Sequence, residues 1–410
     1  MRGELLDFQS IPIAPAESAV VTGLLSGVRI VDLTTVIMGP FASRILADLG
    51  ADVIKVESPG GDSIRAHRPH MAEGLSGMFL NLNRNKRGVM LDLKQEPDRS
   101  RLEALIATAD VFMHNLRAPV MDRLGFGYAR CQALRKDIVY CAAYGFGAAG
   151  PYAAKPAYDD LIQAASGFAS LSEEITGAPA YAPSVIFDKI DGQAIATAIL
   201  AAIVHRLRTG EGQKVEVPMF EVAVDFNLVE HFGGAAFVPS RGPPGYPRIR
   251  SPERRPFATA NGFACILPYS DKNWRDFFSF TERSDLAADP RFLTFDTRQD
   301  HLGELYGEVR REALKRTTAE WMAFCEKADI PCMPVISIAE IFEDPHIEAV
   351  DLFSTVTHPH GSDYRLIRSP VGYGAAPFEL RHHAPLLGEH TAEVLDNLGA
   401  QPDPDLGGAL

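Results

Sequence analysis

The chain has 410 residues, 46% of them hydrophobic and 23% charged, a composition typical of a globular protein with material for two or three domains. Its 40 Lys and Arg residues against 53 Asp and Glu residues give a formal net charge of −13. Because nucleic acids are bound through basic surfaces, a chain this acidic is a poor candidate for a nucleic-acid-binding protein.

Cysteine usage and the first residues indicate a cytoplasmic protein. The five cysteines are scattered without a C-x-x-C pair, which argues against a disulfide framework and against a zinc site. Residues 1–23 carry Glu4 and Asp7 where a signal peptide needs a basic head and an apolar run, so we expect an extended N-terminal arm there. The longest nearly apolar run, residues 194–204, is shorter than the roughly 20 residues that cross a bilayer, so we expect no membrane-spanning segment.

The first half of the chain alternates between strand and helix patterns. Residues 28–33 are a β-branched run, residues 41–49 have the apolar spacing of a helix, and residues 53–56 form a second strand. A strand–helix–strand unit of this kind predicts an α/β fold with a parallel sheet. Further strands are predicted at 89–93, 111–114 and 138–142, with a helix over 101–109.

The second half changes in character after another helix and strand, predicted over 190–208 and 214–218. Residues 239–256 contain six prolines and five arginines, a composition typical of a linker or a mobile loop. Residues 257–334 then have the pattern of a smaller α+β unit, with a strand over 262–268 and two amphipathic helices after it. A last helix follows residue 391.

The opening strand–helix–strand unit is also compatible with dinucleotide binding, because Glu57 follows its second strand. That function requires a G-x-G-x-x-G turn, whose glycines let the backbone approach a pyrophosphate. Residues 34–40 contain one glycine, Gly39, and are otherwise largely apolar, so NAD binding is disfavoured. The turn still follows a parallel strand, where α/β sheets bind ligands, and its apolar residues suit an adenine or acyl group.

A set of motifs in a fixed order resembles the class III CoA-transferase family, also called the CaiB/BaiF family. Formyl-CoA transferase, carnitine CoA-transferase and α-methylacyl-CoA racemase are members. The resemblance covers residues 24–398, nearly the whole chain. The motifs are 25–34, Gly39-Pro40-Phe41-Ala42, 46–57, Asn83-Arg84-Asn85-Lys86-Arg87, Arg123-Leu124-Gly125, 144–147, 205–213 and 385–391.

The resemblance implies a discontinuous α/β fold. A Rossmann-like large domain with a parallel sheet is built from both chain ends, a smaller α+β domain comes from the middle, and two ring-like subunits interlock as a homodimer. In this chain the plan gives an N-terminal arm over 1–23, the first part of a large CoA-binding domain over 24–225, a linker over 226–256, a small domain over 257–335, and a return linker with the C-terminal part of the large domain over 336–410.

The resemblance also places the catalytic nucleophile at Asp188, ahead of the predicted long helix. From the residues alone, Asp188 would be the N-cap of that helix, and the two roles are compatible. The positive end of a helix dipole favours an ionised carboxylate, which suits a nucleophile better than a general acid. The implied function is transfer of CoA from an acyl-CoA donor to a carboxylic acid acceptor through an aspartyl anhydride and an aspartyl-CoA thioester.

Coenzyme A and acyl-CoA are implied as substrates, with no permanently bound cofactor and no metal. Lys94 and Arg123 are the expected partners of the CoA phosphates, and the alternative for both is ordinary surface charge. Ser58 stands where relatives have an arginine, which weakens any assignment of a contact there. The residues that match the family's CoA contacts are Ile37, Met38, Leu91, Lys94, Asn115, Leu116, Arg117, Arg123, Tyr144, Gly145 and Phe146.

Two other functions are compatible with the same scaffold. One is a 2-methylacyl-CoA racemase, which needs two acid–base groups that flank the α-carbon. Tyr158 stands where the racemase branch has a histidine, so this function is disfavoured. The other is a non-catalytic CoA-binding protein, which the match at Asp188 disfavours. Expected partners are acyl-CoA, a small carboxylic acid and a second copy of the chain, but neither nucleic acid nor a membrane. The carboxylate pair Asp159 and Asp160 is expected to be structural.

Overall fold

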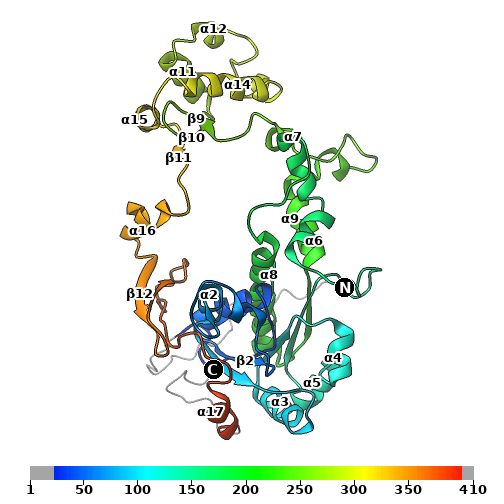
Figure 1. The fold of residues 1–410 in the computed structure, drawn as a ribbon. Helices are drawn as coiled ribbons and strands as arrows, with labels where there is room; N and C mark the ends of the chain where they lie inside the picture. The colour runs from blue at the N-terminus through cyan, green and yellow to red at the C-terminus, as the bar shows by residue number, and fades with distance from the viewer. Residues whose placement is uncertain (1–22, 399–410) are drawn as a thin grey trace, which may run out of the picture. The chain divides into compact units, whose positions relative to one another are not determined.

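A six-stranded sheet contains most of the predicted strands (Figure 1). The computed structural model describes residues 23–398, and the order of the strands in this sheet is β5-β2-β1-β6-β7-β8. The β5–β2, β2–β1, β1–β6 and β6–β7 pairings are parallel. The order reverses between β1 and β6, which marks the switch point of a doubly wound, Rossmann-like sheet. The strands are β1 (Arg29–Asp32), β2 (Asp52–Glu57), β5 (Lys86–Met90), β6 (Val111–His114), β7 (Val139–Tyr144) and β8 (Lys214–Pro218).

The chain divides into two compact units, which we call the sheet unit and the middle unit. Within the described residues, the sheet unit comprises 23–144, 191–217 and 354–398, and the middle unit comprises 145–190 and 218–353. The sheet unit is therefore built from both ends of the chain, which confirms the expected fold class. The domain boundaries and the interlocked dimer stay predictions. The expected N-terminal arm lies outside the described residues, except for Gly23.

Buried apolar side chains hold the sheet unit together. Ile30 of β1 and Phe112 of β6 are fully buried, as expected for parallel strands that are covered on both faces. Leu105 and Tyr140 belong to the same core cluster as Phe112. The helices are α1 (Met38–Asp48), α2 (Gly77–Asn83), α3 (Glu96–Thr108), α4 (Ala118–Leu124), α5 (Tyr128–Leu134), α17 (Thr391–Asp396) and most of α8 (Ile186–Thr209); the smaller elements are η1 (Ser63–Ala66), β3 (His70–Ala72), β4 (Leu75–Ser76), β12 (Phe353–Thr357) and β13 (Asp363–Ile367).

The C-terminal segment is fastened to the sheet by hydrogen bonds around Asn85. The Asn85 backbone N–H donates to the carbonyl oxygen of His382 at 2.7 Å, and its side-chain oxygen accepts from the N–H of Arg381 at 2.7 Å. Arg65 donates to the carbonyl oxygen of Pro385 at 3.0 Å. These bonds connect positions about 300 residues apart in sequence, and they explain how the last segment becomes part of the sheet unit.

The middle unit contains a small three-stranded sheet with helices packed around aromatic side chains. Trp321 is fully buried, stacks on Phe277 with ring centroids 5.7 Å apart, and donates its indole N–H to the carbonyl oxygen of Ala313. The strand order is β11-β10-β9. The elements are α6 (Asp159–Ala165), η2 (Ala169–Ser172), α7 (Glu173–Thr176), α9 (Met219–His231), η3 (Gly233–Ala236), α10 (Pro247–Arg250), β9 (Phe257–Ala258), β10 (Phe263–Ile266), α11 (Asp271–Phe280), α12 (Ser284–Ala287), α13 (Phe295–Gln299), α14 (Leu302–Ala313), α15 (Thr318–Ala328), β11 (Cys332–Pro334), η4 (Glu340–Glu343) and α16 (Pro345–Ala349).

Three sequence-based expectations about elements are wrong in detail. The strand expected over 89–93 is β5, three residues earlier, because its charged first residue Lys86 is buried with polar partners. Two helices are expected after β10, but the structure has five, α11 to α15. The proline- and arginine-rich segment contains the short helix α10.

Helix α8 is long enough and apolar enough to cross a membrane, judged by length and composition alone. A helix in the core of a folded protein passes the same test, and Ile195, Ile199 and Ile203 are buried. The absence of a membrane-spanning segment therefore stays a prediction.

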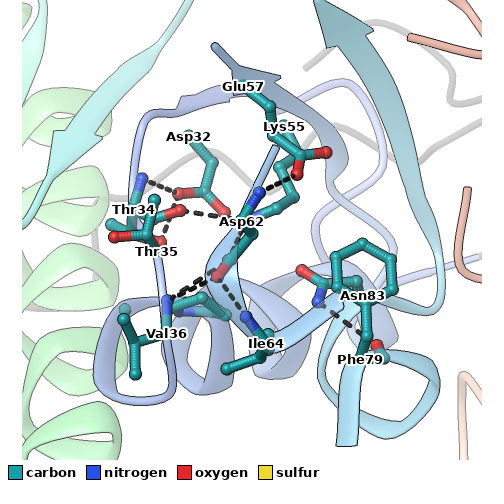
Figure 2. Close-up of polar contacts among 12 residues, drawn as sticks. Asp32, Thr34, Thr35, Val36, Lys55, Glu57, Asp62, Ile64, Phe79 and Asn83 are labelled. Carbon is teal, nitrogen blue, oxygen red and sulfur yellow. Dashed lines mark hydrogen bonds and ion pairs between the residues drawn. The ribbon is translucent and has the colours of Figure 1, made fainter. Parts of the chain in front are cut away.

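A buried ionic network holds the segment that follows β1 (Figure 2). The Lys55 Nζ donates to the carbonyl oxygen of Thr34 at 2.9 Å and to Asp62 Oδ2 at 3.1 Å. The side chains of Lys55 and Asp62 are both fully buried. Asp62 also accepts from the backbone N–H of Val36 at 3.1 Å and of Ile64 at 3.3 Å. Each buried charge thus has the partners that burial demands.

The same network contains a second lysine and a second aspartate. Asp32 accepts from the N–H of Thr34 at 2.8 Å and forms an ion pair with Lys86 at 3.5 Å. Burial lowers the pKa of Lys86 to about 7, although Asp32 opposes the shift. Lys86 also donates to Asn83 Oδ1 at 2.9 Å. Lys55 and Lys86 thus each donate to a backbone carbonyl oxygen near the turn that joins β1 to α1, Lys55 to that of Thr34 and Lys86 to that of Pro40.

We predict that Asp62→Asn lowers the free energy of unfolding by about 3–5 kcal/mol, because it leaves the Lys55 ammonium group buried without its counter-charge. Chemical denaturation followed by circular dichroism measures the change. Glu96→Gln is the matched control, because Glu96 pairs with Arg99 while 75% of its side chain is exposed. Such an exposed pair contributes about 1 kcal/mol or less. Equal losses in the two variants would contradict the assigned role of the buried pair.

Candidate active site

Asp188 lies in the first turn of α8, and its carboxylate is not the cap of that helix. The helix begins at Ile186, so Asp188 is its third residue, and the expected N-cap role is wrong. The cap comes from Asp159, at the start of α6. Asp159 Oδ1 accepts from the backbone N–H of Phe187 at 2.7 Å and of Asp188 at 3.1 Å. A buried carboxylate thus satisfies two N–H groups that the helix itself cannot pair.

Gln163 completes the support of this helix start from one turn further along α6. Its side-chain amide donates to Asp159 Oδ2, and its Oε1 accepts from the backbone N–H of Ala182 at 2.8 Å. Both Asp159 and Gln163 are buried. Helix α6 therefore fixes the chain that leads into α8 as well as the first turn of α8. Asp159 has the structural role expected of it, and it does so through this helix cap.

Burial and the neighbouring Asp159 carboxylate raise the pKa of Asp188 to about 7, while Lys189 has the opposite effect. The expectation that the helix dipole keeps Asp188 strongly ionised is therefore wrong. Partial burial penalises the charge more than the helix end favours it. Near neutral pH the carboxylate and carboxylic acid forms of Asp188 coexist, and the carboxylate that is present is poorly solvated.

The structure brings many of the expected CoA contacts of the sheet unit to one edge of the sheet. Leu91 and Lys94 follow β5, Ile37 and Met38 follow β1, and Tyr144 is the last residue of β7. The parallel strands all end at this edge, where doubly wound sheets bind their ligands. Four further candidates come after β6, and Arg123 among them lies in α4: Asn115, Leu116, Arg117 and Arg123.

Asn115 joins the two loops that flank the switch point. Its Oδ1 accepts from the backbone N–H of Thr35 at 3.1 Å, and its Nδ2 donates to the carbonyl oxygen of Thr35 at 2.9 Å. The residue after Thr35, Val36, has a φ of 71°, which is rare for a β-branched side chain. This strained residue is held by its bond to Asp62 (Figure 2). A strained turn at the ligand-binding edge of a sheet is a mark of a functional site.

Two basic side chains at this edge lack a carboxylate partner. Lys94 and Arg123 are exposed, and neither forms an ion pair with a carboxylate within residues 23–398. Most other basic residues in this unit are paired, as Arg87 is with Asp52. Guanidinium and ammonium groups that are free of carboxylates are available to bind phosphate.

The remaining two candidates, Gly145 and Phe146, belong to the middle unit, like Asp188. A Cβ on Gly145 would lie 2.1 Å from the Cβ of Ala157, so only glycine fits there. The Gly145 carbonyl oxygen accepts from the N–H of Phe220 at 3.0 Å. The ring of Phe146 is buried against Tyr152 and Phe220, with centroids 5.6 and 5.5 Å away.

Sequence reasoning expected Asp159 to be structural, but it missed both its role as the cap of α8 and the support from Gln163. The Asp159-x-x-x-Gln163 spacing places both side chains on one face of a helix, which is a usable sign. The strain at Val36 has no sign in the sequence, because β-branched residues normally avoid a positive φ. Across the described part of the chain, no three His, Cys, Asp or Glu side chains cluster closely enough to hold a metal ion.

Known CoA-transferases are similar to this protein over nearly the whole length of the chain. Residues 25–391 match the model of CoA-transferase family III. The chain is 34% identical to succinate–glutarate CoA-transferase of Agrobacterium fabrum, over 91% of this chain and 95% of that protein. It is 32% identical to succinyl-CoA:mesaconate CoA-transferase of Haloarcula hispanica, over 92% and 97%. It is 29% identical to formyl-CoA:oxalate CoA-transferase of Escherichia coli O157:H7, over 92% and 96%.

Solved structures show the same fold. Rv3272 from Mycobacterium tuberculosis matches with a TM-score of 0.79 and 28% identity, over 91% of this chain and 99% of that one. A CaiB/BaiF family protein from Brucella suis matches with a TM-score of 0.78 and 28% identity, over 92% and 100%. The protein therefore belongs to CoA-transferase family III and is a CoA-transferase.

Proposed function

We propose that this enzyme moves CoA from an acyl-CoA donor to a small carboxylic acid, with Asp188 as the nucleophile. The observation that carries the proposal is the placement of Asp188. Its backbone N–H is fixed by Asp159, and its carboxylate is partly buried and has a raised pKa. A poorly solvated carboxylate on a fixed backbone is a better nucleophile than one in water.

The proposed reaction begins when a carboxylate oxygen of Asp188 attacks the thioester carbonyl carbon of the donor. The carbon–sulfur bond breaks, and the products are a mixed anhydride on Asp188 and CoA thiolate. The thiolate then attacks the aspartyl carbonyl carbon, which releases the donor acid and leaves an aspartyl-CoA thioester. The thioester bond energy is thereby kept on the enzyme.

The acceptor acid completes the cycle by the reverse order of steps. Its carboxylate attacks the aspartyl-CoA carbonyl carbon, which expels CoA thiolate and forms a second anhydride. The thiolate attacks the acceptor's carbonyl carbon, and the new acyl-CoA leaves while the Asp188 carboxylate is restored. Atoms and charge balance without ATP. Water must be excluded throughout, because it would hydrolyse the anhydrides.

CoA is proposed to bind at the carboxyl edge of the sheet, with Lys94 and Arg123 on its phosphates. The switch point and the strained turn near Ile37 support this placement. The acid is proposed to be a short dicarboxylic acid. Support for that class comes from the names of three relatives, which act on succinate and glutarate, on mesaconate, and on oxalate.

We further propose that the enzyme is an interlocked homodimer in the cytoplasm. Support for self-association comes from the apolar surface of α9 and the residues after it. Phe220, Val224 and Val229 belong to the lining of a groove of about 390 Å³ on that helix. The side chain of Val229 is 80% exposed and that of Val238 is fully exposed. Apolar side chains exposed along one helix and its groove are typical of an interface.

We predict that Asp188→Ala lowers the rate of CoA transfer at least about a thousandfold, because it removes the group that carries the acyl and CoA intermediates. The fold and CoA binding should be retained. Transfer is measured by mass spectrometry of the CoA esters formed from a donor acyl-CoA and a free acid. Asp160→Ala, an exposed neighbour of Asp159, is the control and should keep most activity. Substantial turnover by Asp188→Ala would disprove the covalent mechanism.

We predict that kcat/KM rises with pH and reaches half of its plateau near pH 7, because the ionised form of Asp188 is the nucleophile and its pKa is about 7. Asp159→Asn keeps an oxygen that caps α8 but removes a charge that raises this pKa. The rising limb of its profile should therefore shift to lower pH. A profile that is the same in both proteins would contradict the assigned electrostatic coupling.

The same pKa shift has a consequence for stability. The folded-state pKa of Asp188 is above its unfolded value, so the folded protein binds more protons between about pH 4 and 7. The contribution of Asp188 to the free energy of unfolding therefore falls as the pH rises through that window. Asp188→Asn should be more stable than the parent at pH 8, and the difference should shrink at pH 5.

We predict a dimer that persists on dilution, because interlocked chains separate only when one of them unfolds. Analytical ultracentrifugation over a wide range of protein concentrations tests this. Unfolding and dissociation should coincide, and a reductant should change neither, because all five cysteines are free. A folded monomer at low concentration would disprove the interlocked arrangement and leave the catalytic assignment intact.

A further inference from the structure

The proline- and arginine-rich segment, expected to be a linker or mobile loop, lines a pocket in the middle unit. The cavity has a volume of about 240 Å³. Three arginines of the segment, Arg248, Arg254 and Arg255, form one part of its lining. The other part comes from Pro256, Phe257, Cys265, Ile266, Leu267 and Tyr306. We call this cavity the arginine pocket.

The arginine pocket is lined by positive charge without a carboxylate. Within the described chain, Arg254 and Arg255 have no acidic partner, and Arg255 donates instead to the carbonyl oxygen of Pro252 at 2.7 Å. The nearest acidic residue in the sequence, Glu253, pairs with Arg310 at 3.2 Å. Several guanidinium groups around one cavity repel one another, so their arrangement favours an anion between them.

One of these guanidinium groups is held in place by aromatic side chains. Arg248 Nε donates to Tyr306 Oη at 3.1 Å, and its guanidinium lies 5.6 Å from the centroid of the Tyr269 ring. Tyr306 is buried in the core of the middle unit. Arg248 therefore does not swing freely like a surface arginine. A fixed guanidinium loses less conformational entropy when it binds a ligand.

The size and the walls of the pocket define its ligand. Sites for drug-sized ligands measure about 300–1,000 Å³, so a cavity of about 240 Å³ fits a smaller molecule. Phe257 and Ile266 are buried apolar residues in its wall. An apolar wall contributes no binding free energy to a hydrated inorganic anion. It does stabilise an anion that carries a short hydrocarbon chain, because that chain is removed from water. Carboxylates also match the planar fork of a guanidinium group.

We propose that the arginine pocket binds a small organic carboxylate with a short hydrocarbon chain. This assigns to the middle unit a carboxylate site formed by residues other than Asp188 and the expected CoA contacts. The choice of acid rests on the proposed function, since short dicarboxylic acids are the proposed acceptors. The binding itself does not depend on Asp188.

Calorimetric titration of the full-length protein with glutarate, in the absence of acyl-CoA, tests the proposal. Arg254→Gln/Arg255→Gln should weaken glutarate binding at least about tenfold, since it removes two charge-assisted contacts. Arg241→Gln is the matched control, because Arg241 belongs to the same segment but lies over Phe237 outside the lining. It should bind glutarate like the parent. Circular dichroism verifies that each variant is folded.

Other arms of the experiment separate this proposal from its rivals. Asp188→Ala should bind glutarate like the parent. If Asp188→Ala loses glutarate binding while Arg254→Gln/Arg255→Gln keeps it, the proposed carboxylate site in the arginine pocket is wrong and the proposed function is unaffected. Inorganic phosphate that binds as tightly as glutarate overturns the carboxylate class. If CoA displaces glutarate from the parent but does not bind to Arg254→Gln/Arg255→Gln, the arginine pocket binds CoA phosphates, and the carboxylate proposal is wrong. Residual transfer by Asp188→Ala disproves the mechanism without affecting the pocket.

Discussion

The ion pair between Lys55 and Asp62 is the interaction on which the turn after β1, at the carboxyl edge of the sheet, depends. Lys55 enters from β2 and Asp62 from the segment after it, and together they bond Thr34 and Val36 in the turn after β1 (Figure 2). That turn lacks the glycines that normally permit close ligand approach, and it places a valine at positive φ. A conformation that costs energy persists only when its surroundings fix it. Here Asp62 binds the backbone N–H of Val36 and is itself paired with the fully buried Lys55, so breaking the turn would leave a buried charge without a partner.

A second carboxylate, Asp159, couples the cap of α8 to the pKa of Asp188. It supplies the cap that α8 needs, so the first turn of α8 forms with its N–H groups satisfied. The same negative charge lies near Asp188 and, with burial, moves the pKa of that side chain towards neutrality. A neutral cap would serve the helix equally well and leave Asp188 less perturbed. On the proposed mechanism, the arrangement gives up some stability to keep the nucleophile poorly solvated, as functional sites commonly do.

The sequence predicted the fold better than it predicted the site. An apolar run located β6 to the residue, and the alternation of charged residues with valine located β8 to the residue. β5 was misplaced because Lys86, the residue at its start, is buried only through contacts that the linear pattern does not contain. The same limit applied to Asp188: its helix position was nearly right, but the capping partner lies 29 residues away in α6. The expected CoA contacts came from resemblance to a family, and their shared sheet edge follows from strand order rather than from any local motif.

Charge balance distinguishes the arginines that hold this fold together from those that remain for ligands. In a chain with a net charge of −13, acidic partners are abundant: Arg283 is paired with three carboxylates and Arg291 with two. A basic residue that stays unpaired in such a chain is therefore informative. Lys94 and Arg123 are exposed at the sheet edge. A strongly hydrated phosphate group can bind at such a site without losing its hydration shell. Arg254 and Arg255 are exposed as well, but they border apolar walls, where we propose that a carboxylate on a hydrocarbon chain gains from both charge and burial. On these two proposals, the surroundings of the unpaired charges, rather than the charges alone, separate the phosphates of CoA from a small carboxylate.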